Sequence, residues 1–459
     1  MTAPVEPDVE NTPAHRERLL HDPVRREQVL RWLIPGLLLL VAVLNVFLHV
    51  RTYTMVSPVD ELQHIDYLFR SPAVVAPGDT VGDDAMREQA CRGIDAPGFP
   101  VPACTVDGDY RPRDFQENGY NTASINTPVY YTITHAIAWV VQKVTGMESL
   151  VTAGRLVGAL WLGAGLVVAY FAGLRLGAPR WALAAVLSAV ACVPAVVYPS
   201  STITPDAATF LAGALVLWTG LWWEDNPLRR WPWLAAVTAF VVLLKMTNIL
   251  APLALGLYIV FRLVASYRRG SGASPADRRG WWVGGSTIAA TAAVALVGWS
   301  VIQAARAHGD PSDVPMNARF AVQAMAVDPI FASLGLWITP ISAAWVPVGD
   351  ETLSTLLLRF PPLLMTAGFL ATALFGVGMG RARTLAWGYL IPAVVGAPAF
   401  IVLSFVAQSV YVPPPLRYGY VLAPAMVIFA ALHLRAAAWQ WTVGGAAAVA
   451  VLLSAVRLT

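Results

Sequence analysis

Hydrophobic stretches about as long as a membrane is thick recur along most of this chain. A helix needs about 20 apolar residues to cross the hydrocarbon core of a bilayer. Hydrophobic residues make up 57% of the 459 residues and charged residues only 13%, so the chain cannot hide its apolar surface in a water-soluble core. We predict an all-α polytopic membrane protein with about eleven transmembrane helices. The candidate spans are residues 32–50, 151–173, 181–199, 206–222, 232–246, 248–264, 282–304, 361–380, 385–407, 417–434 and 437–456.

The arginines predict how these spans are oriented. Short cytoplasmic loops carry an excess of Lys and Arg. Arginines gather ahead of the first span and in the short segments 175–180, 229–230, 262–279 and 381–383. All of these segments lie on the cytoplasmic side only if a further apolar stretch, residues 127–144, does not cross the membrane. We therefore predict that this stretch is a helix on the outer surface, that the N-terminus is cytoplasmic and that the C-terminus is outside.

This topology divides the chain into six parts. They are a cytoplasmic tail (1–31), a first transmembrane helix (32–50), an extracytoplasmic loop with juxtamembrane helices (51–150), a transmembrane bundle (151–304), a second long extracytoplasmic segment (305–360) and C-terminal transmembrane helices (361–459). Cys91 and Cys104 both lie in the first long loop. Because the space outside the cytoplasm is oxidising, we expect these two cysteines to form a disulfide, with two free thiols as the alternative.

An acidic segment that contains a histidine follows the first span. Pro58 precedes Asp60 and Glu61, and His64 follows within one helical turn of Asp60. Crowded carboxylates raise one another's pKa toward the range in which a carboxylate acts as a base. The alternative is structural, because Asp60 in a first helical turn could cap the helix or pair with His64.

Other ionisable residues stand at the outer ends of later spans. They are Asp206, Lys245 and Arg417, the last followed by Tyr418. Charged groups near membrane depth are costly and mark candidate functional sites. Each has a simpler explanation: capping for Asp206, and anchoring at the membrane interface for Lys245 and Arg417.

Several site chemistries find no support in the sequence. The histidines do not cluster at metal-ligand spacings, and no phosphate-binding loop, nucleophile elbow or basic block for nucleic acid occurs. Acids and cations at the lipid–water boundary suit transfer of a group from an anionic lipid carrier. A carboxylate would take the proton of an acceptor hydroxyl, and Lys or Arg would stabilise the departing phosphate.

The motif Pro-x-Asp-Glu-x-x-His at residues 58–64 resembles that of a bacterial family of GT-C superfamily membrane glycosyltransferases. Residues 126–131, which end in Tyr130 and Tyr131, are similar to the family's Pro-Pro-x-Tyr-Tyr surface helix. Arg155 at the start of the next span, Pro205-Asp206, Lys245 and Arg417-Tyr418 follow in the family's order. The order of these motifs resembles that of the family over most of the chain. Only the first motif is specific to the family.

The resemblance implies a GT-C fold and a polyprenyl-phosphate sugar donor. Asp60 matches the first-loop catalytic acid, with Glu61 beside it, and Asp206 matches the second-loop acid; His64, Tyr130 and Tyr131 would support the acceptor. Related transferases often carry a phosphate-binding Lys where this chain has Asn126, and Thr127 replaces the first Pro. Phosphate binding would therefore fall to Lys245, Arg417, Tyr418 and Arg155. Some members use a divalent cation, and the sequence leaves open whether Asp60, Glu61 and Asp206 hold one.

The expected acceptor is a glycan or glycolipid of a bacterial cell envelope, reached from the outer face of the cell membrane. Two other functions are compatible with the sequence: a transporter or flippase of lipid-linked sugars, and a non-catalytic envelope assembly protein. Transporters usually place ionisable residues near the bilayer midplane and contain repeats. The charges here map to span ends and no repeat is evident, which favours the transferase.

Overall fold

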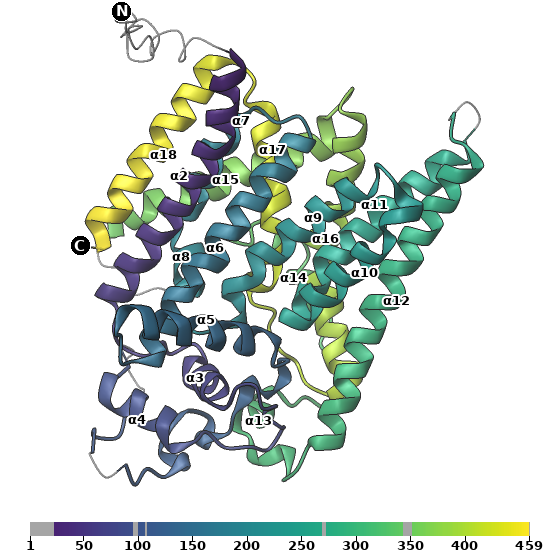
Figure 1. Ribbon diagram of the computed structural model, residues 1–459. Helices are drawn as coiled ribbons and strands as arrows, with labels where there is room; N and C mark the ends of the chain where they lie inside the picture. Colours follow the sequence, from purple (N-terminus) through teal and green to yellow (C-terminus); the bar gives the residue numbers. More distant parts are fainter. Residues whose placement is uncertain (1–22, 95–99, 106–107, 269–271, 343–350, 459) are drawn as a thin grey trace, which may run out of the picture.

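The computed structural model describes residues 23–458 apart from 95–99, 106–107, 269–271 and 343–350. The predicted tail 1–31 therefore falls largely outside the described residues, as does a part of the second long segment. Within the described residues the structure is helical, with three isolated β-bridges and no strand. Long helices form a bundle, and a smaller group of short helices covers one end of it (Figure 1).

Seven helical segments among the described residues are long and apolar enough to cross a membrane. These are Trp32–Thr52, Leu150–Arg175, Met246–Ser266, Pro275–Arg306, Gly380–Ala407, Leu416–His433 and Ala437–Val456. Five of them belong to α2 (Pro23–Thr52), α6 (Leu150–Arg175), α12 (Pro275–Arg306), α16 (Gly380–Gln408) and α18 (Ala437–Leu458). The other two each join a 3₁₀ segment to a helix: η6 (Met246–Ile249) with α11 (Leu250–Ser266), and η9 (Leu416–Leu422) with α17 (Ala423–His433). The prediction of an α-helical polytopic membrane protein is confirmed.

The other four predicted spans also coincide with helices, but none of these meets the requirements of length and apolarity as a single helix among the described residues. Residues 181–199 form α7 (Arg180–Ala191) and α8 (Pro194–Ser200), which meet at a bend of 69°. Pro194 explains the break, because its ring blocks continuation of the helix that precedes it. The remaining three are α9 (Thr209–Trp223), α10 (Pro227–Leu244) and α15 (Glu351–Phe375). A total of eleven crossings stays a prediction.

Small residues allow the helices of the bundle to approach closely, as is common in membranes. A Cβ atom added at Gly158 of α6 would lie 1.7 Å from the carbonyl oxygen of Ser200 at the end of α8. A Cβ at Gly213 of α9 would lie 1.9 Å from the carbonyl oxygen of Val421. These contacts bring the ends of α8 and α9 close to the segment that carries Arg417.

The first long loop folds into a compact unit at one end of the bundle (Figure 1). It contains α3 (Glu61–Arg70), α4 (Asp83–Arg92) and α5 (Val129–Thr145), with three short 3₁₀ turns at Pro112–Asp114, Gln116–Gly119 and Thr122–Ile125. Leu62, Ile65, Met86 and Phe115 are among the residues that form its own apolar core. A disulfide joins Cys91 at the end of α4 to Cys104.

Helix α5, the apolar stretch whose crossing was in question, runs across the end of the bundle in Figure 1 and packs against α6. It is not among the helices that meet the length and apolarity required for crossing. This position matches the surface helix expected from the arginine distribution.

The second long segment packs against the first loop. It contains η7 (Pro311–Asp313), α13 (Pro315–Phe320), α14 (Asp328–Ala332) and η8 (Leu336–Ile338). His308 donates its backbone N–H to the carbonyl of Pro77 at 3.0 Å, and Arg319 forms an ion pair with Glu117. Gly78 is required at this contact, since its φ is +99° and an added Cβ would lie 2.0 Å from the carbonyl oxygen of His308.

Candidate functional site

Asp60 occupies the position just before α3, in a left-handed backbone conformation (φ 58°, ψ 11°). This conformation is uncommon for a residue other than glycine and is often found at functional sites. The side chain makes no capping hydrogen bond to the helix, so the capping role considered from the sequence is not observed. Instead, Asp60 lines a cavity of about 210 Å³ together with His64, Asp206 and Arg417.

Four charged residues from distant parts of the chain converge beside this cavity. The Nη2 atom of Arg417 lies 3.5 Å from Oδ2 of Asp60, and its Nε atom lies 3.7 Å from Oδ2 of Asp206. Asp206 is buried at the start of η5 (Pro205–Ala208) and pairs with the ammonium group of Lys245. The structure thus brings together two acids and two cations that the sequence placed at the outer ends of separate spans.

Lys245 lies at a break in the helices. It separates α10 from η6 (Met246–Ile249), and its backbone is extended (φ −162°) rather than helical. Its side chain is only 9% exposed and lies 4.9 Å from the ring centroid of Tyr418. The break directs the ammonium group inward to Asp206, so Lys245 does not anchor the chain at the membrane interface.

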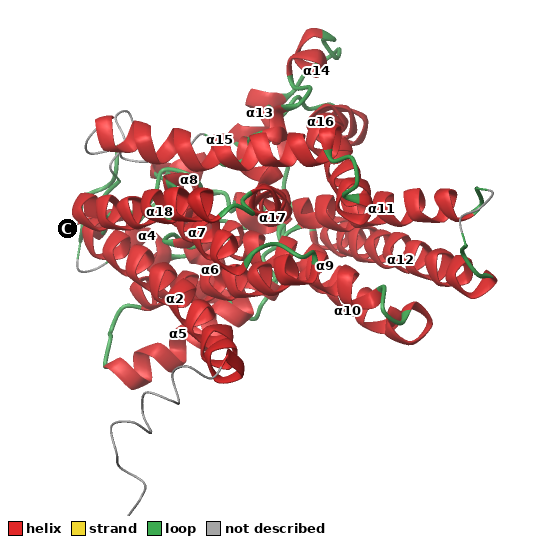
Figure 2. Ribbon diagram, turned by 90° about the horizontal axis from the view of Figure 1, so that it is seen from above, coloured by secondary structure: helices red, strands yellow, loops and turns green. Residues whose placement is uncertain are grey.

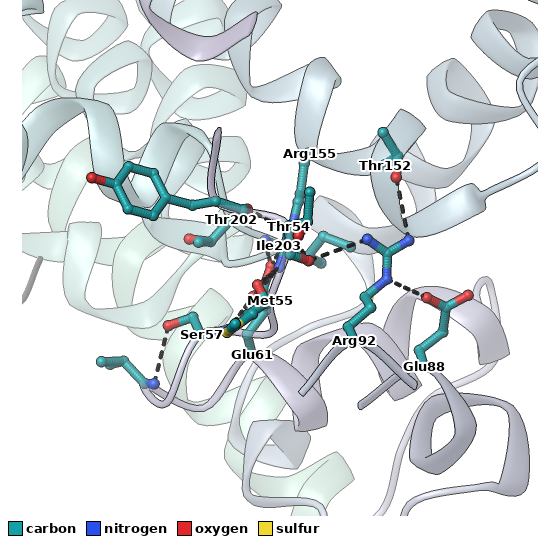
Figure 3. Close-up of polar contacts among 12 residues, drawn as sticks. Thr54, Met55, Ser57, Glu61, Glu88, Arg92, Thr152, Arg155, Thr202 and Ile203 are labelled. Carbon is teal, nitrogen blue, oxygen red and sulfur yellow. Dashed lines mark hydrogen bonds and ion pairs between the residues drawn. The ribbon is translucent and has the colours of Figure 1, made fainter. Parts of the chain in front are cut away.

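Glu61 and Arg155 form a buried ion pair (Figure 3). Neither residue lines the cavity beside Asp60. Both Glu61 carboxylate oxygens accept hydrogen bonds from Arg155, at 2.8 and 2.7 Å. Each oxygen also accepts a backbone N–H, one from Ile203 at 2.9 Å and the other from Ser57 at 2.7 Å. A carboxylate with four donors around it has no lone pair available for an acceptor hydroxyl.

The guanidinium group of Arg155 is equally saturated. Besides Glu61, it donates to the carbonyl oxygens of Tyr53 and Thr54, both at 3.2 Å, and of Met55 at 2.7 Å. Its five N–H donors are thus all used, and its side chain is 2% exposed. The roles predicted for Glu61 in catalysis and for Arg155 in phosphate binding do not fit this geometry; the two residues instead join the first loop to α6.

Tyr131 of α5 packs against α3. Nδ1 of His64 lies 2.6 Å from the hydroxyl of Tyr131, and the rings of Tyr67 and Tyr131 are stacked at 4.0 Å. Tyr130 packs against Tyr131 with its ring 5.2 Å away and is buried. His64 lines the cavity with Asp60 but pairs with Tyr131, so the predicted Asp60–His64 pair is not formed.

The surrounding protein shifts the pKa of Asp60, just before α3, and of His64, within α3. The protein around Asp60 withdraws its carboxyl from bulk water, which raises its pKa, while Arg417 acts in the opposite direction. Burial lowers the pKa of His64 to about 3. His64 is therefore neutral at physiological pH, and Asp60 is the group in the cavity best suited to accept a proton.

Sequence reasoning missed the polar residues that complete the cavity wall. Tyr198, Thr202 and Thr204 line it, and the hydroxyl groups of Tyr198 and Ser57 are hydrogen-bonded to each other. The signal in the sequence was the run Tyr-Pro-Ser-Ser-Thr at 198–202, which places hydroxyl groups at the outer end of a span.

An apolar groove begins beside the charge cluster. Its volume is about 790 Å³, and side chains of α11, α12 and α16 form most of its wall. Thr247 lies at one end of the groove, two residues after Lys245, and the groove residue Phe400 contacts the ring of Tyr418 at 5.3 Å. A residue close to Lys245 in sequence, and the ring that contacts Tyr418, thus belong to the wall of this groove.

The three carboxylates proposed for a divalent cation do not converge. Glu61 is enclosed by four donors, and Arg417 lies between Asp60 and Asp206. Within the described part of the chain, no group of three His, Cys, Asp or Glu side chains is arranged to hold a metal ion. We therefore assign no step to a bound cation.

Comparison with models of known protein families gave no match, and comparison with curated proteins gave no significant match.

Proposed function

We propose that this chain is a GT-C-type membrane glycosyltransferase that transfers a sugar from a polyprenyl-phosphate donor to an acceptor of a bacterial cell envelope. The reaction would take place on the extracytoplasmic face. The observation that carries the proposal is the meeting of Asp60 with Arg417, Asp206 and Lys245 beside one cavity. The motif at residues 58–64, which resembles that of the GT-C family, supports it.

In the proposed reaction, an acceptor hydroxyl attacks the anomeric carbon of the donor sugar. A new C–O bond forms, the bond between the anomeric carbon and the phosphate oxygen breaks, and polyprenyl phosphate leaves with the electron pair. The acceptor proton passes to the carboxylate of Asp60, whose raised pKa makes it a better base. General-base help of this kind contributes about 10²–10⁴ in rate.

The cations are placed to stabilise the departing phosphate. Arg417 lies next to Asp60 and lines the cavity, and Lys245 is more deeply buried, two residues before the groove residue Thr247. Charge that develops on a leaving group is best stabilised by groups that are already fixed in position. Asp206 fixes both cations through its ion pairs and is therefore a positioning residue.

The apolar groove supports a lipid-linked donor. A hydrocarbon chain in a groove of about 790 Å³ would extend from the cations along α11, α12 and α16. Such a pairing of a charged head site with an apolar groove would bring the phosphate to membrane depth without any nucleotide.

The substitution Asp60→Asn tests the proposal. We expect transfer from a panel of synthetic polyprenyl-phosphate sugars to fall by about 10² or more, because the amide cannot accept the proton. The protein would be reconstituted in liposomes with envelope lipid extract as acceptor, and release of polyprenyl phosphate would be measured. Asp114→Asn, an outer-loop carboxylate paired with Arg111, is the matched control and should keep full activity.

Two results would contradict the proposal. Undiminished transfer by the Asp60→Asn protein would remove Asp60 from the mechanism. Movement of intact lipid-linked sugar across the liposome membrane by the wild-type protein, with no release of polyprenyl phosphate, would show a flippase instead.

A further inference from the structure

A second cavity adjoins the first on the side of α2 and α8. Its volume is about 240 Å³. Its wall includes His49, Tyr53, Ser57, Tyr198, Ser201 and Thr202. Tyr198 and Thr202 belong to both cavities, so the two are separated by little more than these side chains.

The hydrogen bond between the hydroxyl groups of Ser57 and Tyr198 lies where the cavities meet. Ser57 is three residues ahead of Asp60, and its Oγ also accepts the backbone N–H of Val59 at 3.1 Å. A ligand in the second cavity would therefore lie next to the cavity that Asp60 lines, with the side chains of Tyr198 and Thr202 between them.

The polar groups of the second cavity favour a ligand that donates hydrogen bonds. Ser201 donates its hydroxyl hydrogen to the backbone carbonyl of Val197 at 2.8 Å, and Thr202 donates its own to the backbone carbonyl of Tyr198 at 3.1 Å. Their oxygen lone pairs remain to accept hydrogen bonds from a ligand. Aromatic faces form another part of the wall, where the ring of His49 contacts Tyr53 at 4.6 Å and Tyr198 at 5.9 Å.

The charge of the wall favours a neutral ligand. No Asp, Glu or Lys is among the residues that line the cavity, and its one guanidinium group, that of Arg155, has its donors occupied by Glu61 and backbone carbonyls. His49 is the remaining ionisable side chain of the wall, so an anionic group would find no permanently charged cation available there. A sugar with several hydroxyl groups matches both the acceptor oxygens and the ring faces.

The helices that line the second cavity and those that line the apolar groove lie on opposite sides of the molecule. Figures 1 and 2 both show α2 and α8 on one side of the molecule and α11 and α12 on the other. A series of ion pairs links Lys245 to Asp206, Asp206 to Arg417 and Arg417 to Asp60. A donor and an acceptor that enter from opposite sides would meet at Asp60.

We infer that the second cavity is the acceptor subsite and that it takes an uncharged, hydroxyl-rich sugar unit. This inference rests on the proposed function, because it assigns the other substrate of the same reaction. It predicts that the two substrates bind independently, one through the cations and one through hydroxyl and aromatic groups.

Binding of two probes to the full-length protein in nanodiscs tests the inference. The acceptor probes are octyl glucoside, octyl galactoside and octyl mannoside below their micellar concentrations, with octyl glucuronide as the anionic comparison; the donor probe is undecaprenyl phosphate. Thr54→Trp adds bulk at an exposed position on the second cavity, away from the residues that line the first. Thr105→Trp, an exposed outer-loop position that lines neither cavity, is the control.

We expect at least one neutral glycoside to bind more tightly than the glucuronide, and Thr54→Trp to weaken that binding tenfold or more. Undecaprenyl phosphate affinity should stay within twofold in this variant, and Lys245→Ala should weaken undecaprenyl phosphate alone. The inference is overturned if no neutral glycoside binds, if the glucuronide binds as tightly, or if Thr54→Trp has no effect on glycosides or weakens both probes. Loss of glycoside binding in Thr54→Trp, without undecaprenyl phosphate binding to the wild type, would uphold this cavity and contradict the proposed donor.

Discussion

Asp60 and Glu61 are neighbours in the chain, but their carboxylates have different surroundings. Asp60 is 49% exposed and faces the cavity, with one guanidinium group near it. Glu61 is 1% exposed and receives hydrogen bonds from Arg155 and two backbone N–H groups. The two carboxylates point in different directions because the left-handed backbone of Asp60 turns the chain sharply just before α3 begins. One carboxylate is thereby available for proton transfer, and the other holds the loop to the bundle.

A buried ion pair of this kind is costly to break. We expect Glu61→Gln to destabilise the protein by about 3–5 kcal/mol, because Arg155 would remain buried without its counter-charge. Thermal unfolding in detergent would show a lower Tm, and the double variant with Arg155→Gln should lose less than the sum of the two single changes. A Glu61→Gln protein that unfolds like the wild type yet transfers no sugar would restore Glu61 to the catalytic group.

His64 predicts a specific pH dependence of stability. Its pKa is about 6.5 in the unfolded chain and about 3 in the folded protein. Between these values the unfolded state binds more protons, so this group stabilises the fold fully above pH 6.5 and loses up to about 1.4 kcal/mol per pH unit as the pH falls toward 3. The Tm of the wild type should fall more steeply between pH 6.5 and 4.5 than that of His64→Gln. Equal slopes for the two proteins would contradict a buried neutral His64.

At the scale of the element, α3 and α5 work as a pair. Stacked Tyr67 and Tyr131 join them, and the hydrogen bond between His64 and Tyr131 fixes the face of α3 that reaches the cavity. The far side of α3 is held by Asp66, which accepts the backbone N–H of Gly82 at 2.8 Å and the side-chain amide of Asn121 at 2.7 Å. Asp60 is thus presented by a helix that is anchored on both sides.

The position of α5 can be tested by cysteine labelling. The wild-type chain is a suitable background, because Cys91 and Cys104 are joined and Cys192 is buried. We expect Thr145→Cys, at the exposed end of α5, to react with a membrane-impermeant maleimide in intact cells, and Ala276→Cys, near the start of α12, to react only after permeabilisation. If α5 crossed the membrane, the two results would be reversed.

At the scale of the whole molecule, the two long non-spanning segments and the bundle meet around the site. Trp337 in η8 shows how the second segment contributes: its indole N–H donates to the carbonyl of Pro415 at 3.1 Å. A Cβ at Gly419 would lie 2.5 Å from the Cβ of Trp337. Trp337 thus contacts the chain both before Arg417, at Pro415, and after it, at Gly419. The direction of Arg417 toward Asp60 therefore depends on a residue about 80 positions away in sequence.

The order of apolar and charged residues along the chain predicted the class of fold and the segments that carry the charged residues. It was sufficient for the α-helical membrane architecture, because each span must satisfy its backbone hydrogen bonds internally and its length reflects the bilayer. The arginines also predict a surface position for α5, which the cysteine labelling tests. The same patterns placed Asp60, Asp206, Lys245 and Arg417 at the ends of spans, from which a shared site could be expected.

Only the tertiary structure decided which charged group pairs with which. Glu61 and Arg155 were expected in the chemistry, and the fold turns them to each other because the backbone at Asp60 reverses direction before α3. The break at Lys245 points its ammonium group to Asp206, and Tyr198 divides one cavity from the next. Contacts of this kind join residues far apart in the chain, and their geometry depends on ångström-scale packing that no local pattern in the sequence encodes.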